Sequence, residues 1–412
     1  MINKLNGTVA IIGQGYVGLP LAMTLVEANW NVIGFDSDED KIRLLNLGLS
    51  SIEDVDNSLI LKSIRNGRYL PTTEFNHLLK ARIIVICVPT PLDELNNPDL
   101  SILKNAIQSI APYIQNESLI ISESTSFPGT LRNLVVKEVL NLTLIKNPLF
   151  YFAVAPERVN PGDKIWNQKN TPRLVAGLTD TDREKAIEFY ETFCDKVIRV
   201  DTPEIAEAAK LLENTFRLIN ISAINEFSQL CHISGINVNS VIDAAATKPY
   251  GYMAFRPGAG AGGHCIPVDP VYLMKWSENF QFRYGSLENA IKVNSEIPFY
   301  IASRIKILLG ERINPKVLIL GIGYKPGLSD TREAPAEKLF NVLEESGITV
   351  KWYDPLVDKW IKEKCSSLDE NFDAAVLITN QPGMNISQLI QNKVPILDCT
   401  NTYQNVDGIF PL

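Results

Sequence analysis

A cysteine in a glycine-rich loop is the residue of this chain best suited to covalent chemistry. Cys265 ends the run 258–265, Gly-Ala-Gly-Ala-Gly-Gly-His-Cys, and the carboxylate of Asp269 follows four residues later. Glycines let a backbone approach a ligand closely, and a thiol with an acid nearby is typical of a nucleophile presented to a substrate. The same loop also fits a buried cysteine behind a flexible turn, so the loop alone leaves both interpretations open.

A lysine and an amide form a second pair with chemical potential. Residues 204–233 have a helical pattern without proline or interior glycine, which predicts a helix of roughly 40 Å. Lys210 and Asn214 lie four residues apart on one face of that helix, where they could polarise a substrate oxygen. An exposed lysine beside a capping-type amide is the alternative. A helix of this length can bridge two domains and offer a dimer face.

The first elements of the chain predict a dinucleotide-binding turn. An apolar run at residues 9–12 indicates a buried parallel strand, and residues 13–18 follow it with the pattern Gly-x-Gly-x-x-Gly. A helical pattern then covers residues 19–26, and a second strand at residues 31–36 ends in an acid. This context makes the glycine pattern far more specific than the pattern alone.

Each glycine of this turn has a physical role in holding NAD. Gly13 permits the tight turn, Gly15 lets the backbone approach a pyrophosphate, and Gly18 lets the helix pack on the strand. The helix N-terminus then faces the phosphates. Asp36 would accept hydrogen bonds from the adenosine ribose and repel a 2′-phosphate, so NAD is expected rather than NADP. A structural glycine turn in another α/β domain is the alternative.

Three further strands are expected to end at the same edge of the sheet. Ligands of open parallel sheets collect at the carboxyl ends of the strands, and Thr90, Thr125 and Glu157 each follow one such end. A helix cap or a turn is the other common role of these residue types. The three strands are predicted at residues 83–88, 119–122 and 152–155.

The C-terminal part repeats the opening plan. A strand is followed by a glycine turn, a helix that runs to about residue 346, and a strand that ends in an acid. Here the turn region carries Lys325 and Arg332, which could neutralise a second diphosphate or reach the first cofactor. The predicted strands cover residues 316–321, 350–354 and 374–379. A second parallel sheet is therefore expected.

Composition limits the classes of function. A chain of 412 residues exceeds one ordinary core, so two or three domains are expected. The net charge of −8, without a basic run, argues against nucleic-acid binding. No apolar stretch approaches the roughly 20 residues of a membrane span, and no signal peptide is expected before the first strand. The six cysteines are scattered without zinc-like spacing, so we expect no metal site and a reducing cytoplasm.

Together these residues resemble the UDP-glucose/GDP-mannose dehydrogenase family over essentially the whole chain. The resemblance implies an α/β fold with two Rossmann-like doubly wound parallel sheets, joined by a long central helix and a small helical domain. It implies an NAD-binding domain at residues 1–202, a central domain at 203–304 and a UDP-sugar-binding domain at 305–412. Its marks are the turn 13–18, Pro156-Glu157-Arg158, Lys210 with Asn214-Thr215, Gly262-Gly263-His264-Cys265 with Pro267 and Asp269, Gly323-Tyr324-Lys325, and Asp330 with Arg332-Glu333.

The resemblance implies a four-electron oxidation of a sugar C6 alcohol to a carboxylate with two NAD molecules in turn. Cys265 would form a thiohemiacetal and then a thioester, which water hydrolyses. Lys210 and Asn214 would stabilise the oxyanion. Asp269 and Thr125 would position water and assist proton transfer, and Glu157 would serve hydrolysis of the thioester.

The resemblance also implies which residues hold the two ligands. For NAD these are Gly13, Gly15, Tyr16, Val17, Gly18, Asp36, Lys41, Thr90, Thr125 and Arg332. For the UDP-sugar they are Glu157, Arg158, Lys210, Asn214, Arg256, Gly262, His264 and Lys325. His264 either acts as a base near neutral pH or shapes the loop and contacts substrate. A homodimer through the long helix is expected.

Two departures bear on the sugar. UDP-glucose and GDP-mannose members typically carry a lysine where this chain has Val268, and they typically lack a residue like His264. These positions, with Pro156–Gly162, resemble the branch that acts on UDP-N-acetylhexosamines. UDP-N-acetylglucosamine is the first expectation, then UDP-N-acetylgalactosamine and UDP-N-acetylmannosamine, with UDP-glucose as an alternative. The product would feed surface polysaccharide synthesis. A sensor that binds NAD and a nucleotide sugar without turnover is the non-enzymatic alternative.

Overall fold

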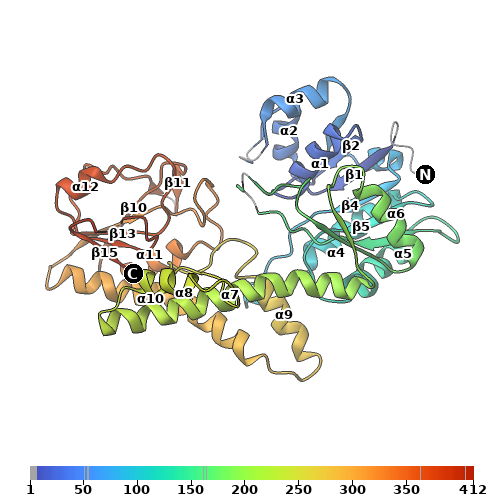
Figure 1. Ribbon diagram of the computed structural model, residues 1–412. Helices are drawn as coiled ribbons and strands as arrows, with labels where there is room; N and C mark the ends of the chain where they lie inside the picture. Colours follow the sequence, from blue (N-terminus) through green and yellow to red (C-terminus); the bar gives the residue numbers. More distant parts are fainter. Residues whose placement is uncertain are drawn as a thin grey trace. The chain divides into compact units, whose positions relative to one another are not determined.

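The structure is a computed structural model that describes residues 7–50, 52, 55–160, 162–163, 165–361, 363–403 and 405–412, so Pro161 of the Pro156–Gly162 motif lies outside the described residues. The chain forms two compact units. The first contains the described residues up to Glu213 together with Val271–Asn279, and the second contains Asn214–Pro270 and Phe280–Leu412 (Figure 1). The three domains expected from the sequence stay a prediction.

The first unit is built on an eight-stranded sheet in the order β3-β2-β1-β4-β5-β6-β7-β8. Its first six strands have the order of a dinucleotide-binding fold, with the switch point between β1 and β4. Strands β1 to β6 pair in parallel, as predicted for all of them except β3, which the sequence analysis did not anticipate. Strand β7 pairs antiparallel with β6 and parallel with β8. The strands are β1 (Thr8–Ile12), β2 (Asn31–Phe35), β3 (Tyr69–Thr72), β4 (Ile83–Ile86), β5 (Leu119–Ser122), β6 (Tyr151–Val154), β7 (Arg173–Gly177) and β8 (Val197–Arg199).

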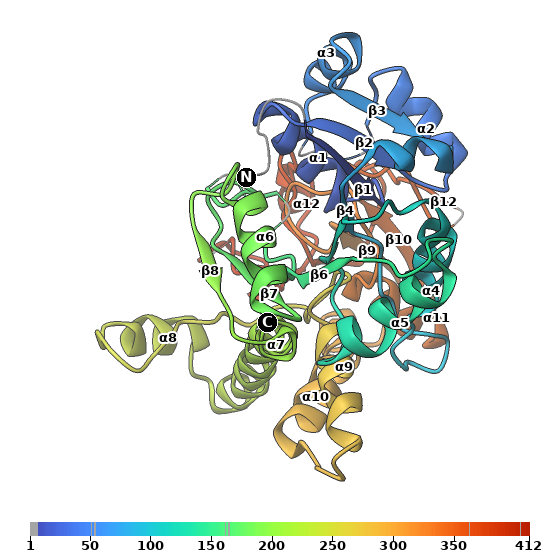
Figure 2. The ribbon, with the colours of Figure 1, turned by 90° about the vertical axis from the view of Figure 1, so that its right-hand side faces the viewer.

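Helices cover both faces of this sheet. Alternate strand residues point to opposite faces, and both faces are apolar, so each face has its own core. One core includes α1, α3 and α6, and the other includes α4, η3 and α5; Figure 2 shows α6 on one side of the sheet and α4 and α5 on the other. The helices are α1 (Gly18–Glu27), α2 (Glu39–Asn46), α3 (Asn57–Arg65), η1 (Phe75–Lys80), α4 (Ser101–Ile110), η2 (Ala111–Tyr113), η3 (Leu131–Val135), α5 (Val136–Leu142) and α6 (Asp180–Tyr190).

The second unit contains a five-stranded parallel sheet in the order β10-β9-β13-β14-β15. Its switch point lies between β9 and β13, next to the second glycine turn. Helices α10 and α11 pack on one face, and α12 packs on the other. The elements are β9 (Lys316–Leu320), α11 (Pro335–Glu345), β10 (Thr349–Tyr353), β11 (Lys359–Trp360), β12 (Glu363–Lys364), β13 (Ala374–Leu377), α12 (Ser387–Gln391), β14 (Ile396–Asp398) and β15 (Ile409–Pro411).

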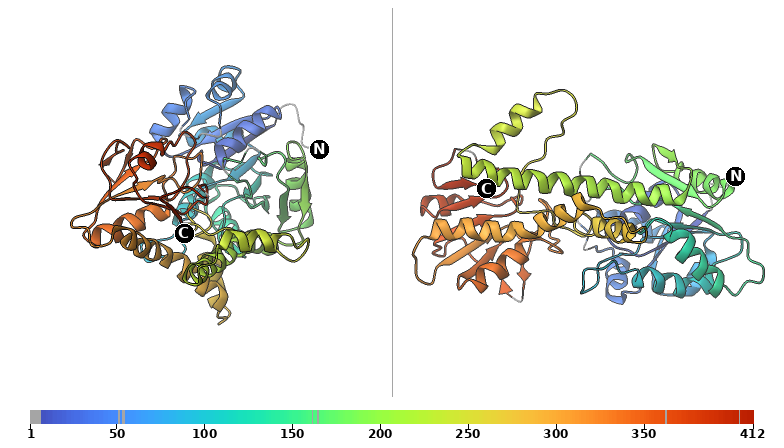
Figure 3. Two further views of the ribbon diagram at one scale, coloured as in Figure 1. Left: turned by 60° about the vertical axis from the view of Figure 1, so that its left-hand side comes forward. Right: turned by 90° about the horizontal axis from the view of Figure 1, so that it is seen from below.

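The predicted long helix is confirmed as α7 (Pro203–Ser234), an uninterrupted helix whose N-terminal part belongs to the first unit and whose C-terminal part belongs to the second (Figure 3). The other helices of this region are α8 (Val238–Ala246), α9 (Asp269–Glu278) and α10 (Gly285–Leu309). Across the part of the chain that the structure describes, none of the helices combines the length and apolarity that a membrane crossing needs.

Candidate active site

The glycine turn after β1 has the geometry that a bound pyrophosphate needs. Gly13 has φ +95°, and a Cβ there would lie 2.8 Å from the carbonyl oxygen of Cys87. A Cβ on Gly18 would lie 1.9 Å from the carbonyl oxygen of Gly13, so only glycine lets α1 begin this close to the strand. Among the described residues, no atom lies within 4 Å of a Cβ built on Gly15. The turn is therefore tight on its protein side and open where a phosphate would approach.

Asp36 follows β2 and is held in place by the turn itself. Its Oδ2 accepts hydrogen bonds from the Gln14 backbone N–H and from Nζ of Lys41, each at 2.8 Å, and its Oδ1 accepts from the Asp38 backbone N–H at 3.0 Å. The Gln14 side chain in turn accepts a hydrogen bond from the Tyr69 hydroxyl at 2.6 Å. The carboxylate and Lys41 thus form one ion pair beside the expected ribose position.

Tyr16 and Val17, which are also expected at the cofactor, lie in the turn between Gly15 and Gly18. Both are half-buried and pack against the core that α1 shares with the sheet. They therefore shape the turn from its protein side.

Thr90, Thr125 and Glu157 lie at one edge of the first sheet. They follow the neighbouring parallel strands β4, β5 and β6, and all three are half-buried. The backbone N–H of Glu157 donates to the carbonyl of Glu123 at 3.3 Å, and the Glu157 carboxylate accepts from the backbone N–H of Val159. The expected grouping of these three residues is thus present, and hydrogen bonds join two of their loops.

A buried ion pair that sequence reasoning missed supports this edge. Glu123, two residues before Thr125, lies 3.2 Å from the guanidinium of Arg173 on β7, and the Tyr190 hydroxyl donates to its other oxygen at 2.5 Å. The side chains of Glu123 and Arg173 are 0% and 2% exposed. Burial raises the pKa of Glu123, and the charge of Arg173 opposes that shift. The sequence signal was an acid at a strand end, with no sign of its partner.

Helix α7 carries three polar residues of interest, Glu207, Lys210 and Asn214, at positions i, i+3 and i+7. Glu207 is buried and accepts the backbone N–H groups of Gly129 at 2.5 Å and Leu131 at 3.0 Å. Its burial raises its pKa to about 7, although these hydrogen bonds lower it. Lys210 is 6% exposed, and Asn214 is half-buried one turn further on. The exposed-lysine alternative for Lys210 is therefore wrong. Glu207 could have been inferred from the sequence as an acid on the Lys210 face.

The cysteine loop brings the second set of expected residues together. Nδ2 of Asn214 donates to Oδ2 of Asp269 at 2.5 Å. Asp269 is 3% exposed and begins α9, and its backbone N–H donates to the carbonyl of Cys265 at 2.9 Å. Cys265 is half-buried, so its thiol is neither sealed in a core nor fully exposed. The amide, the carboxylate and the cysteine thus form one connected group in the second unit.

Two glycines before the cysteine allow close packing against the second glycine turn. A Cβ on Gly263, whose φ is +82°, would lie 2.7 Å from the ring of Tyr324. A Cβ on Gly262 would lie 2.8 Å from Pro335. Gly262 therefore forms part of the packing that carries the thiol, in addition to the substrate contact expected for it.

Two helix amides that sequence reasoning missed hold the same loop. Oδ1 of Asn225 on α7 accepts the backbone N–H of Gly258 at 2.9 Å, and Oδ1 of Asn294 on α10 accepts that of Ala261 at 2.7 Å. Asn225 lies eleven residues after Asn214, which is close to three helical turns. The sequence could therefore have indicated that Asn225 lies on the same helix face as Asn214. For Asn294 the sequence offered none.

His264 and Arg332, which are distant in sequence, meet beside the cysteine. Nη2 of Arg332 lies 3.5 Å from Nδ1 of His264, and Oδ2 of Asp330 lies 3.9 Å from that same nitrogen. Arg332 also binds Asp330 at 2.6 Å. Burial would raise the pKa of Asp330, but its hydrogen bonds and ion pair with Arg332 outweigh burial and lower it. Lys325 is half-buried in the neighbouring turn.

Two expected substrate arginines are engaged in ion pairs within their own units. Arg158 pairs with Glu213 at 2.7 Å and donates to the carbonyl of Pro172 at 2.9 Å. Arg256 pairs with Asp243 of α8. Both guanidinium groups would need to share or exchange these partners to bind a sugar nucleotide.

The second glycine turn differs from the first in what fills it. A Cβ on Gly323 would lie 2.6 Å from Nε2 of Gln381 and 2.6 Å from the carbonyl oxygen of Leu328. The same nitrogen donates to Asp354, which follows β10 as Asp36 follows β2. A protein side chain thus occupies the place that is open at Gly15. The neutralisation of a second diphosphate by Lys325 and Arg332 stays a prediction.

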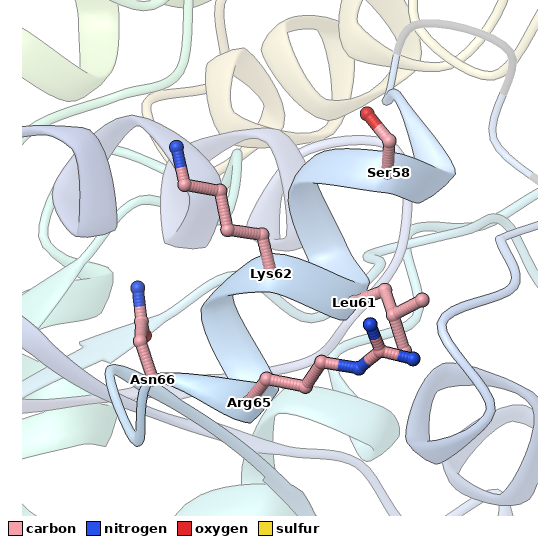
Figure 4. A pocket seen from close by; sticks show the side chains of 5 residues that line it. All are labelled: Ser58, Leu61, Lys62, Arg65 and Asn66. Atoms are coloured by element: carbon pink, nitrogen blue, oxygen red, sulfur yellow. The ribbon is translucent and has the colours of Figure 1, made fainter.

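A surface hollow on the first unit lies apart from these groups. It has a volume of about 470 Å³ and is open to solvent along α3 (Figure 4). The hollow is lined by Ser58, Leu61, Lys62, Arg65 and Asn66.

Within the described ranges, no three or more His, Cys, Asp or Glu side chains gather as a metal site.

Three regions of the chain match one protein family. Residues 7–194 match the NAD binding domain of the UDP-glucose/GDP-mannose dehydrogenase family, residues 204–296 its central domain and residues 318–405 its UDP binding domain. A UDP-N-acetyl-D-mannosamine dehydrogenase of Methanocaldococcus jannaschii is 34% identical over 97% of this chain and 93% of its own. A UDP-N-acetyl-D-glucosamine 6-dehydrogenase of Pseudomonas aeruginosa is 33% identical over 85% of this chain and 83% of its own.

A solved structure has the same fold along the whole chain. The UDP-D-ManNAc dehydrogenase of Pyrococcus horikoshii superposes with a TM-score of 0.89 at 32% identity, covering 98% of both chains. The two parallel-sheet units, the open first turn and the matches to all three family regions lead to one assignment. The chain belongs to the UDP-glucose/GDP-mannose dehydrogenase family and is an NAD-dependent nucleotide-sugar dehydrogenase.

Proposed function

We propose that this enzyme oxidises the C6 hydroxyl of a UDP-N-acetylhexosamine to a carboxylate through covalent intermediates on Cys265. The observation that carries the proposal is the connected group of Asn214, Asp269 and Cys265 in a half-buried loop. A thiol so placed can add to an aldehyde carbon, and the resulting thiohemiacetal loses hydride far more readily than a free aldehyde. The half-burial of Cys265 and the backbone hydrogen bond that its carbonyl accepts from Asp269 support this assignment.

The reaction divides into four steps. The alcohol first loses a hydride from C6 and a proton from its oxygen, which gives an aldehyde. The sulfur of Cys265 then forms a bond to that carbon, the carbonyl oxygen takes up a proton, and the thiol proton is lost. Loss of a second hydride and of the hydroxyl proton gives a thioester. Water finally replaces sulfur, which releases the carboxylate and restores the thiol.

Polar residues of this chain would manage the charge and the protons. The ammonium of Lys210, a buried residue, and the amide of Asn214 would stabilise negative charge on the substrate oxygen, because such donors act strongly where water is excluded. Asp269 and Thr125 would position water and assist proton transfer. Glu157 would serve the hydrolysis of the thioester.

NAD would be held by the first glycine turn and, when bound, accepts a hydride in each oxidation. The open cradle at Gly15 and the carboxylate of Asp36 fit its pyrophosphate and ribose, and Lys41 neutralises that carboxylate in part. Thr90 and Arg332 would make further contacts to the cofactor. On the substrate side we propose Arg158, Arg256, His264 and Lys325 as contacts to the UDP-sugar. We also keep, as a proposal, the three domain ranges expected from the sequence.

For the sugar, two relatives favour UDP-N-acetylmannosamine over UDP-N-acetylglucosamine, which reverses the order expected from the sequence. One mannosamine-type relative is 34% identical, and a mannosamine-type solved structure has a TM-score of 0.89. His264 and Val268 support an N-acetylhexosamine over UDP-glucose. Epimers differ by one hydroxyl, which a pocket that hydrogen-bonds it can discriminate strongly.

Two measurements test the proposal. First, kcat/KM is compared for UDP-N-acetylmannosamine, UDP-N-acetylglucosamine, UDP-N-acetylgalactosamine and UDP-glucose; a preference for UDP-glucose would refute the substrate class. Second, NADH is counted per sugar consumed. We expect two for the unmodified enzyme, and Cys265→Ser should stop at the aldehyde or lose activity. Full turnover by that variant would remove the thiol from the mechanism, and binding without NADH formation would favour the sensor.

We also propose that two copies pair through α7. Besides its core face, the helix carries a second apolar stripe, whose members follow one another at spacings of four, eleven, three and three residues and so stay on one side of the helix. Such a stripe is the sequence signature of helix packing, and a stripe this exposed on one chain marks an interaction surface. Its members are Leu212 (56% exposed), Phe216 (48%), Phe227 (38%), Leu230 (60%) and Ile233 (83%).

A further inference from the structure

In the loop that carries Cys265, the backbone of Ala261 is held by the side chain of Asn294. Oδ1 of Asn294 accepts the backbone N–H of Ala261 at 2.7 Å, and Nδ2 of Asn294 donates to the carbonyl of Ala261 at 3.3 Å. One carboxamide therefore satisfies both backbone polar groups of this loop residue, as a neighbouring strand would. Half-buried backbone groups need partners, so the position of this segment depends on Asn294.

Asn294 is itself anchored. It lies on α10, and one turn earlier the hydroxyl of Ser222 on α7 donates to the carbonyl of Ala290 at 2.8 Å. Both Ser222 and Ala290 are buried. Four residues after Asn294, Pro298 lies inside the helix and offers no N–H to the Asn294 carbonyl. The carboxamide thus projects from a buried helix pair, at a turn where the helix lacks one of its own hydrogen bonds.

The segment between this pair and the thiol has little freedom. Gly262 and Gly263 pack so closely on Pro335 and Tyr324 that added Cβ atoms would lie 2.8 Å and 2.7 Å from them. On the far side, the Cys265 carbonyl accepts the backbone N–H of Asp269. A displacement at Ala261 would therefore be passed on to the cysteine.

We propose that Asn294 is a positioning residue for Cys265 that supports the second oxidation more than the first. The inference rests on the proposed function. Loss of the first hydride needs no bond to sulfur, whereas the second oxidation begins only when sulfur has bonded to the aldehyde carbon. A displacement of about 1 Å can cost on the order of 10²-fold in rate, and here that cost would fall on the thiol step alone.

The experiment compares Asn294→Ala, Asn294→Asp and the control Ser295→Ala. Asp keeps an acceptor for the Ala261 N–H but loses the donor, and Ala loses both. Ser295 is exposed, its hydroxyl donates to the Lys292 carbonyl of its own helix, and it lies next to Asn294, so its truncation matches the change without touching the loop. With limiting sugar nucleotide, NADH is counted per sugar consumed, and the aldehyde is trapped with hydroxylamine and quantified by mass spectrometry.

We expect two NADH per sugar and little trapped aldehyde for the unmodified enzyme and Ser295→Ala. Asn294→Ala should give a ratio near one, abundant oxime and a second oxidation slowed by about 10- to 10²-fold relative to the first, with Asn294→Asp in between. Equal slowing of both oxidations, or an unchanged ratio, would overturn the inference. If Asn294→Ala does not fold, the same criteria apply to Asn294→Asp.

A second readout needs no substrate. Iodoacetamide is applied to each protein, and the alkylation rate at the Cys265 peptide is followed by mass spectrometry. The rate should change several-fold in Asn294→Ala and stay constant in Ser295→Ala, and an unchanged rate in Asn294→Ala would contradict the inference. If the unmodified enzyme itself does not form two NADH, the proposed function fails, while this alkylation test still decides whether Asn294 positions the thiol.

Discussion

The amide of Asn214 and the carboxylate of Asp269 lie 2.5 Å apart, nitrogen to oxygen, in a half-buried setting. They come from different helices, α7 and α9, and Asp269 is also tied through its backbone to Cys265. A charge-assisted hydrogen bond of this length is among the stronger polar contacts in proteins. It links the residue proposed to stabilise the oxyanion with the residue proposed to position water, so the two act as one unit.

Asn214→Ala should therefore impair more than oxyanion binding. The change leaves the buried Asp269 carboxylate without this donor, at a cost of about 1–3 kcal/mol. We expect kcat to fall by about 10²-fold, with a smaller change in KM, measured by steady-state NADH formation. Asn220→Ala on the same helix is the control, because its amide is exposed and donates to the Phe216 carbonyl one turn earlier. A loss confined to KM would show that Asn214 serves binding alone.

Glu207 should make the stability of the enzyme depend on pH. Its pKa is raised by burial from 4.5 to about 7, so the folded state retains a proton that the unfolded state has already lost between those values. The stabilisation is complete below about pH 4.5 and is lost as pH rises through about 7, amounting to about 3 kcal/mol. Glu207→Gln should remove this slope. Thermal unfolding from pH 5 to pH 8 checks it, and equal slopes in both proteins would contradict the assignment.

The buried pair of Glu123 and Arg173 should show strong coupling. Arg173→Met leaves a buried carboxylate uncompensated and should cost about 3–5 kcal/mol. Replacing both residues, as Glu123→Gln with Arg173→Met, should recover much of that loss. Urea unfolding of both single variants and the double variant measures the coupling. Additive losses would mean that the two side chains stabilise the fold independently.

Charges on the second apolar stripe of α7 should separate the proposed dimer. Phe227→Asp combined with Leu230→Asp places two carboxylates in that stripe, and we expect a monomer in light scattering at micromolar concentration. His232→Asp adds a charge at an exposed position outside the stripe and should leave the dimer intact. A monomeric unmodified protein would rule out the pairing.

Local patterns in the sequence predicted much of the fold. The strands around Gly13, the turn and the carboxylate of Asp36 all lie within a short stretch of chain, and each element has its own period of apolar residues. The long helix was equally visible, because nothing in residues 204–233 interrupts it. The antiparallel β7 was not visible, because strand direction is set by how the chain returns to the sheet rather than by the strand itself.

The supporting contacts of the site could not be predicted in the same way. Glu123 and Arg173 are 50 residues apart, and Glu207 and Gly129 are 78 apart. No periodicity links such pairs, and each residue alone fits a surface position. The two glycine turns show the same limit. Gly15 and Gly323 have similar sequence surroundings, but the space beside Gly323 is filled by the side chain of Gln381, which lies 58 residues further along the chain.

The filled turn at Gly323 has a consequence for inhibition kinetics. Gln381 fills the turn at Gly323, whereas the turn at Gly15 is open, so among the described residues the adenine dinucleotide is expected at Gly15. NADH should then compete with NAD alone, and raising the concentration of the sugar nucleotide should not relieve that competition. A dinucleotide analogue would titrate one equivalent per chain, and an inhibitor that resembles the sugar nucleotide would act independently of it.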